Sequence, residues 1–112
     1  MSDTLRQLKK GVTTLIVLDA LEHAPLYGYG LRQEAYKRTR GTFNFSEGAL
    51  YPLLHSLERK RWVKATRREV AGRERRYYTI TAAGRQSLTQ LRRDWRFLMR
   101  SLERLTTPRR RP

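Results

Sequence analysis

The chain of 112 residues contains no cysteine, which excludes disulfide bonds and thiolate metal sites. Its two histidines, His23 and His55, stand far apart in the sequence and make a poor metal site without cysteine. We therefore expect neither a metal nor a cofactor. A protein without cysteine also fits a reducing compartment, so we expect it to be cytoplasmic.

Long apolar segments are missing as well. The longest uncharged run before Asp19 is GVTTLIVL, far short of the roughly 20 apolar residues that span a bilayer. Asp19 interrupts this stretch, and the following EHAPLYG offers no small-residue cleavage site, so the N-terminus does not resemble a signal peptide. The sequence predicts no membrane partner and no export.

Acidic residues are scarce relative to basic ones. The chain has 25 lysines and arginines but only 10 aspartates and glutamates, which gives a formal net charge of +15 and a pI near 11.3. Such a charge attracts polyanions, nucleic acid first among them. The length allows one compact domain. Because no nucleophile is paired with a base and no glycine-rich phosphate loop is present, we do not expect an enzyme.

Apolar residues at helical spacing predict a first helix over residues 4–22, weakly interrupted at Gly11. Pro25 ends this helix, and a second helix begins near Tyr27 or Gly28 and ends before Gly41. Residues 42–45 alternate polar and aromatic side chains, which predicts a short strand that pairs with a later hairpin.

A third helix, residues 46–60, begins at the capping residue Ser46, with Phe45 and Leu50 placed to form a hydrophobic staple. Its leucines recur at spacings of three and four residues and predict one face directed to the core. The opposite arc therefore faces outward, with Tyr51 on its flank; it holds Gly48, Pro52, His55 and Arg59.

A basic hairpin follows this helix. Residues 63–70 are strand-like, residues 71–74 are turn-like and residues 75–80 return as a strand. Nine cations and only two acids lie between Arg59 and Arg76, a density that suits contact with phosphates. A helix followed by such a hairpin is typical of a winged helix-turn-helix.

The last predicted helix, residues 82–105, is capped by Thr81 and carries apolar residues at alternating steps of three and four. So long a helix cannot bury this heptad seam within so small a chain, which predicts a partner helix and a homodimer. The arginines of this helix, Arg92 included, form a solvated polar face. The seam consists of Leu88, Leu91, Trp95, Leu98, Leu102 and Leu105.

These elements predict a mainly α fold with a small β-wing. Residues 1–81 form a winged helix-turn-helix preceded by an N-terminal helix, residues 82–105 a dimerisation helix, and residues 106–112 a basic disordered tail.

Four stretches carry a resemblance to a known family: LIVLDAL, PLYGYGL, EGALYPLLHSLE and GRERRYYTITAAGRQSL. Together they resemble the PadR-like transcriptional regulators, in the short subgroup with one C-terminal helix. The resemblance implies a dimeric repressor of detoxification, efflux or stress genes. One position departs from the pattern, because Arg61 stands where the family has a glycine after the recognition helix, and a left-handed cap is harder for arginine.

We assign the contact with duplex DNA to the outward arc of the third helix, to the residues at and just before the start of this helix and to the wing. We expect the DNA to be a pseudo-palindromic operator. Tyr51 could instead pack across the wing, and Gly48 could be a glycine for packing alone. A small basic RNA-binding or ribosome-associated protein would also explain the charge, but not a heptad seam joined to a winged helix. The assigned residues are Tyr29, Asn44, Ser46, Gly48, Tyr51, Pro52, His55, Arg73, Arg75 and Arg76.

Two interpretations of Trp95 remain open. It packs in the dimer seam, as aromatic residues at heptad spacing do, or it stacks against a small aromatic effector with Met99 nearby. In the first interpretation the seam is fully packed, and protein concentration alone sets regulation.

Overall fold

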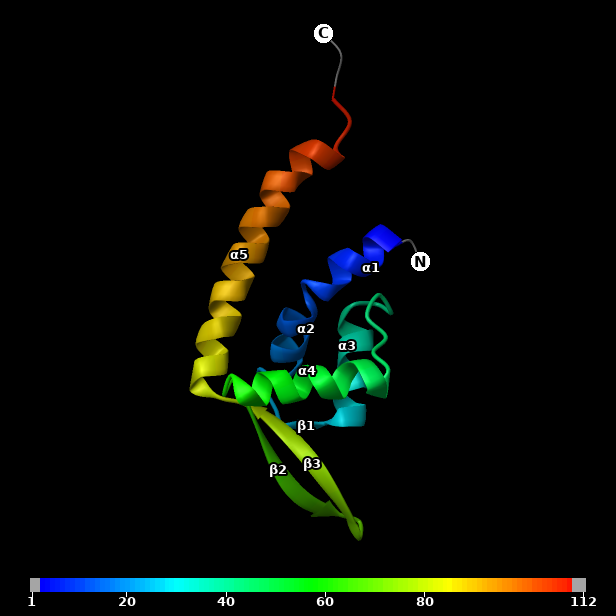
Figure 1. Cartoon of the computed structure of the whole chain (residues 1–112), viewed down its shortest axis with the longest axis vertical. Helices are drawn as coiled ribbons and strands as arrows, with labels where there is room; N and C mark the ends of the chain where they lie inside the picture. Colours follow the sequence, from blue (N-terminus) through cyan, green and yellow to red (C-terminus); the bar gives the residue numbers. More distant parts are fainter. Residues whose placement is uncertain (1–2, 110–112) are drawn as a thin grey trace.

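The computed structural model describes residues 3–109, which form five helices and three strands (Figure 1). The wing and the last helix project in opposite directions from the body of the molecule. The elements in chain order are α1 (Asp3–Lys10), α2 (Thr13–Ala20), β1 (Leu26–Tyr27), α3 (Gly28–Arg38), α4 (Glu47–Arg59), β2 (Val63–Val70), β3 (Arg73–Ile80) and α5 (Ala82–Thr106).

The N-terminal segment is two helices, not the single helix expected over residues 4–22. A turn at Gly11–Val12 separates α1 from α2, with the Val12 amide donating to the Lys9 carbonyl at 3.2 Å. Burial explains the break. Val17 and Leu18 of α2 are fully buried in the core, whereas α1 leaves its leucines exposed.

The prediction of a strand at residues 42–45 is wrong. This segment has no strand pairing, and the third strand of the sheet is instead β1, which pairs antiparallel with β3 and gives the order β1-β3-β2. Phe43 and Phe45 account for the alternation, because both are buried in the core and their ring centroids lie 6.0 Å apart. The alternation of polar and aromatic residues therefore reflects the packing of the two rings in the core and not pairing in a β-sheet.

The core joins α2, α3, α4, the base of the sheet and the start of α5. Thr81 caps α5 as expected, accepting the Gly84 amide at 3.0 Å. A Cβ on Gly84 would lie 2.1 Å from the Trp62 carbonyl, so only glycine lets α5 approach the chain there. Fully or almost fully buried side chains include Leu18, Leu31, Leu54, Leu57, Tyr78 and Leu88.

The hairpin turn is shorter than the four residues expected. Only Ala71 and Gly72 form it, with φ of 53° and 77°, while Arg73 already pairs with Val70 in the ladder. Two consecutive positive φ values match the twist of a two-residue hairpin. Arg73 and Glu74, expected in the turn, therefore belong to β3.

The exit from α4 is a left-handed cap formed by Arg61, whose φ is 62°. The Arg61 amide donates to the Glu58 carbonyl at 2.9 Å, and the Trp62 amide donates to the Leu57 carbonyl at 3.0 Å. This hydrogen-bond pair defines the cap in which glycine is the favoured residue. Arginine thus adopts the family's glycine conformation, at a cost of about 1 kcal/mol.

The last helix reaches Thr106, one residue into the segment expected to be the tail. Thr107 follows as the C-cap, and residues 110–112 lie outside the described residues. The helix contains 25 residues and is therefore about 37 Å long.

Candidate nucleic-acid interface

The outward arc of α4 is exposed, as its sequence pattern predicts. Leu50, Leu54 and Leu57 are fully buried on one side, whereas Gly48 and His55 are exposed on the other. Ser46 caps the helix through its side chain, which accepts the Ala49 amide at 3.2 Å. The helix continues without a break through Pro52, which is also exposed, as are Asn44 and Ser46 just before it. One exposed surface therefore runs along α4 and the residues just before it.

Gly48 has no packing partner that would require a glycine. A Cβ added there would meet, among the described residues, only the Ser46 hydroxyl at 3.9 Å. Gly28 differs, because its added Cβ would lie 2.6 Å from the Tyr51 hydroxyl. Tyr51, which keeps 39% of its surface exposed, therefore lies on the start of α3. It joins the two helices of the helix-turn-helix.

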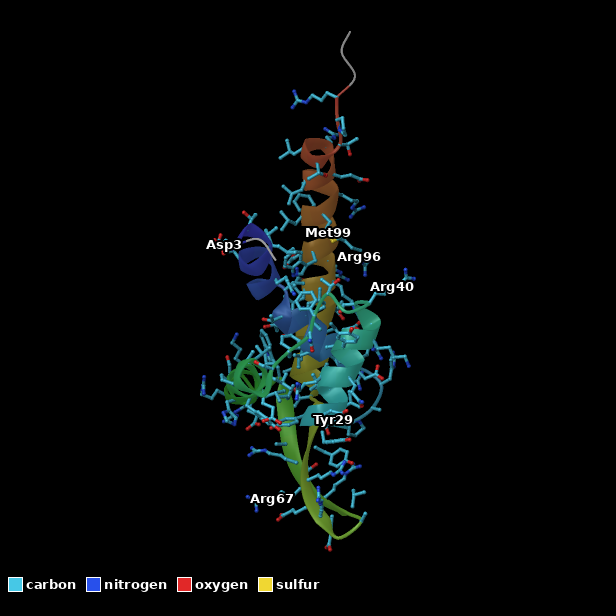
Figure 2. All side chains as sticks on the ribbon, turned by 90° about the vertical axis from the view of Figure 1, so that its right-hand side faces the viewer. Asp3, Tyr29, Arg40, Arg67, Arg96 and Met99 are labelled. Carbon is cyan, nitrogen blue, oxygen red and sulfur yellow. The ribbon has the colours of Figure 1, made fainter. Side chains whose placement is uncertain are left out.

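A surface hollow of about 260 Å³ lies between the starts of α3 and α4 and the wing. Helix N-termini carry partial positive charge, which favours anions at this position. Exposed Tyr29, labelled in Figure 2, stands at the start of α3 beside the hollow. The hollow is lined by Tyr27, Gly28, Tyr29, Arg32, Glu47, Tyr51, Glu74, Arg75 and Arg76.

Hydrogen bonds hold α4 against its neighbours at both ends. At the start of α4, the Arg32 Nε atom donates to the Phe45 carbonyl at 2.7 Å. At its far end, Arg76 of the wing donates to both carboxylate oxygens of Glu58, at 3.1 and 3.3 Å. The assigned contact residue Arg76 thus already has a carboxylate partner, while Arg73 at the hairpin tip is exposed.

A charged cluster that the sequence pattern did not predict joins α2, α3 and α5. Arg92 donates to both carboxylate oxygens of Glu22 at 2.8 Å and to Asp19 at 2.7 Å. Arg38 of α3 also reaches Asp19 at 3.0 Å and Glu34 at 3.0 Å. Assigning Arg92 to a solvated face is therefore wrong, because acids of α2 lie beside it.

The charges in this cluster shift one another's protonation. The hydrogen bonds from Arg92 lower the pKa of Glu22, although partial burial opposes the change. The same hydrogen bonds, to Glu22 and Asp19, raise the pKa of Arg92. Both groups therefore stay charged at neutral pH, and α5 is tied electrostatically to the end of α2.

The heptad seam of α5 divides into an inner and an outer half. Leu88 is only 1% exposed in its own core, so its assignment to a dimer interface is wrong: the body of the chain already covers this turn. Leu91 packs against the same core, and Trp95 is half-buried near Gly11. The outer seam residues are exposed, Leu98 and Leu102 at 43% and Leu105 at 71%.

The two residues assigned to an effector, Trp95 and Met99, are four positions apart on α5 and so lie about one turn apart on the same side of this helix. Met99 is 63% exposed on the outer half of α5. A hollow beside it is lined by Met99, Arg100, Leu102, Glu103 and Thr106, and Trp95 is not part of its lining.

No membrane-spanning helix and no group of three or more His, Cys, Asp or Glu side chains suited to a metal ion occurs within residues 3–109.

Comparisons with known proteins agree on one family. The family model for "Transcriptional regulator PadR-like family" matches residues 17–90. The transcriptional regulator Rv3488 of Mycobacterium tuberculosis is 35% identical over 98 residues, covering 88% of this chain and 89% of that protein. A PadR-like transcriptional regulator from Bacillus cereus superposes with a TM-score of 0.80 at 29% identity, covering 92% and 99% of the two chains. A regulator from Clostridium thermocellum, at 22% identity and a TM-score of 0.83 over 90% and 99% of the chains, shares the fold.

Proposed function

Since the chain belongs to the PadR-like family of DNA-binding transcriptional regulators, we propose that it recognises a pseudo-palindromic operator as a homodimer and represses transcription in the cytoplasm. Members of this family regulate transcription and are not enzymes. The observation that carries the proposal is the exposed arc of α4, where Gly48 has no internal packing role. A glycine at that place lets the helix backbone approach base edges in the major groove.

The remaining contacts divide by their position. Tyr51, Pro52 and His55 lie on or beside the arc that enters the groove, where base edges are read. Tyr29, Asn44 and Ser46 lie at the helix starts and contact phosphates beside the groove. Arg73 and Arg75 of the wing contact the DNA backbone, so they strengthen binding to all sequences alike.

Dimerisation uses the outer half of α5. Leu98, Leu102 and Leu105 leave an exposed apolar stripe that one chain does not cover. A second copy supplies the same stripe, and two antiparallel or crossed helices bury both. Leu91 and Trp95 lie at the inner end of this stripe, where the interface meets the body of the chain.

A small aromatic effector would act at the same interface. The dimer brings two copies of Trp95 and Met99 together, and a planar molecule stacks between them. Such a ligand changes operator affinity only if it binds better to one spacing of the recognition helices than to another. If a panel of planar aromatics neither quenches Trp95 fluorescence in a Trp62→Phe background nor changes operator affinity, the seam is packed and this part of the proposal is wrong.

Selection of bound fragments from random duplex DNA at near-physiological salt tests the function as a whole. We expect enriched fragments that contain two inverted half-sites at one fixed spacing, because a two-fold dimer presents two equal recognition helices. Enrichment of single half-sites would contradict the dimer, and no enrichment at all would contradict sequence-specific recognition.

A further inference from the structure

The two faces of the wing hairpin differ in chemistry. Directly paired residues of β2 and β3 point to the same face, and the pairs Arg68↔Arg75 and Arg67↔Arg76 are neighbours in the ladder. Arg68 and Arg75 therefore share one face, and Arg67 and Arg76 share the other. The first face also holds Arg73, which pairs with Val70, so it carries three arginines and the second carries two. The faces differ further in what surrounds these arginines.

On the first face two arginines lie over tyrosine rings. The Arg68 guanidinium carbon is 5.0 Å from the centroid of the Tyr77 ring, and that of Arg75 is 4.5 Å from the Tyr27 ring. The two rings contact each other, with centroids 5.6 Å apart. We call this set, Tyr27, Arg68, Arg75 and Tyr77, the ring-stacked face.

On the second face the arginines pair with carboxylates. Arg76 binds Glu58 of α4 at 3.1 Å, and Arg67 lies 3.5 Å from Glu74. Arg76 also lies over the buried Tyr78 ring, 5.9 Å from its centroid. Figure 2 shows Arg67 directed to the side on which α4 lies. We call this set, Arg67, Arg76, Glu58 and Glu74, the carboxylate-paired face. Its positive charge is largely offset within the protein.

Stacking on a ring leaves a guanidinium free to bind an anion. A guanidinium held over a ring face spends no N–H donor on an ion pair or a conventional hydrogen bond to that ring, so its donors stay available to an anion. Among the described side chains, neither Arg68 nor Arg75 forms an ion pair. An arginine held in this way loses less side-chain entropy when it binds phosphate than a freely moving one.

The ring-stacked face also adjoins the surface that approaches DNA. Arg75 and Tyr27 line the hollow between the starts of α3 and α4, together with Arg76 and Glu74 of the other face. A DNA strand that passes those helix starts reaches Arg75 next, and Arg68 is its direct neighbour on β2.

We propose that the wing binds DNA phosphates through the ring-stacked face, with Arg68 as a further contact residue and Tyr27 and Tyr77 as positioning residues. Arg67 contributes little to binding, and Arg76 acts mainly by holding the wing to α4. This inference rests on the proposed binding of duplex DNA.

Arg67→Ala and Arg68→Ala form a matched pair that tests the inference, because they remove the same charge from adjacent positions on opposite faces. Duplex affinity is measured by fluorescence anisotropy over a range of salt concentrations. We expect Arg68→Ala to reduce the slope of log affinity against log salt by about one, as the loss of one phosphate contact does, and Arg67→Ala to leave it unchanged. Equal slopes for the two variants, or a larger loss for Arg67→Ala, would overturn the assignment of Arg68 while leaving duplex binding intact. If the wild-type protein binds no duplex DNA, the proposed function and this inference fail together.

The positioning role is tested at Tyr77 with a double-mutant cycle. Tyr77→Phe keeps the ring and is expected to retain the affinity and the salt slope, whereas Tyr77→Leu is expected to lose several-fold in affinity. In an Arg68→Ala background the effect of Tyr77→Leu should shrink, since the arginine that it positions is gone. An undiminished effect in that background would mean that Tyr77 supports the fold alone and would overturn the positioning role.

Discussion

Arg92 of α5 and Glu22 after α2 form a two-pronged ion pair in which both N–O distances are 2.8 Å. The residues are 70 positions apart, and Asp19 adds a third hydrogen bond to the same guanidinium. The pair fixes the base of α5 against the end of α2. Its contribution to folding and its dependence on pH are therefore measurable in the single chain.

Replacement of Arg92 by glutamine should lower the free energy of unfolding by roughly 1 kcal/mol at neutral pH, the scale of a partly exposed charge pair. The measurement is urea denaturation followed by circular dichroism. Gln90→Ala, two residues away on the exposed surface, removes only a hydrogen bond to Asp94; it is the control and should change stability by less. A variant as stable as the wild type would show that the cluster does not stabilise the fold.

The same comparison should depend on pH. Arg92 lowers the pKa of Glu22 in the folded state below its ordinary value of 4.5. A lowered carboxyl pKa contributes stability that is present above the unfolded value and is lost as the pH falls through the folded value. The difference in free energy of unfolding between the wild type and Arg92→Gln should therefore be largest at neutral pH and should shrink in acid. A constant difference down to about pH 3 would contradict a role for Glu22 ionisation.

Replacement of Arg61 by glycine should stabilise the fold by about 1 kcal/mol, because glycine adopts the left-handed cap without the steric cost that arginine bears. Lys60→Gly is the control. Lys60 has an ordinary φ of −76°, so glycine there should destabilise the chain. The midpoint of thermal unfolding is measured for both variants. A lower midpoint for Arg61→Gly than for the wild type would mean that the contacts of the arginine side chain stabilise the fold by more than its backbone strain destabilises it.

Gly48→Ala should separate stability from function. Alanine is the better helix former, and its Cβ meets only Ser46 at 3.9 Å within the described chain, so stability should rise by about 0.5 kcal/mol. Operator affinity should fall about 10-fold, on the scale of one lost base contact, with little change for unrelated DNA. Unchanged operator affinity would show that the helix backbone does not approach the bases there.

Leu98→Asp should abolish the dimer, because an unpaired charge buried in an apolar interface costs several kcal/mol, on the order of an unpaired buried ion. Thr89→Asp adds the same charge to an exposed position on the opposite side of α5 and should leave the dimer intact. Analytical ultracentrifugation compares the two. If Leu98→Asp still forms a tight dimer, the dimer interface lies on another element.

Features set by neighbouring residues were predictable from the sequence. The caps at Ser46 and Thr81 and the buried leucine face of α4 depend on residues three or four positions apart, and the structure confirms all of them. The basic hairpin was predictable for the same reason, since its two strands are joined by a short turn.

Features that depend on distant pairing were not predictable. Leu26 pairs with Tyr78, 52 residues away, whereas residues 42–45 show a similar alternation without any strand partner. Arg92 follows the spacing of a solvated helix face, and nothing in its local sequence reveals the acids of α2. The position of Tyr51 on Gly28 likewise follows from the packing of two helices that sequence periodicity does not orient.

Recognition of DNA sequence by this chain can be tested as a ratio of dissociation constants. Affinity is measured at near-physiological salt for a selected operator, for a scrambled duplex of equal length and composition, and for duplex RNA of the operator sequence. We predict that the operator binds about 1,000-fold more tightly than the scrambled duplex, the lower range for specific DNA-binding proteins, and that the RNA binds no better than the scrambled DNA. Equal affinity for operator and scrambled DNA, or tighter binding to the RNA, would contradict the account.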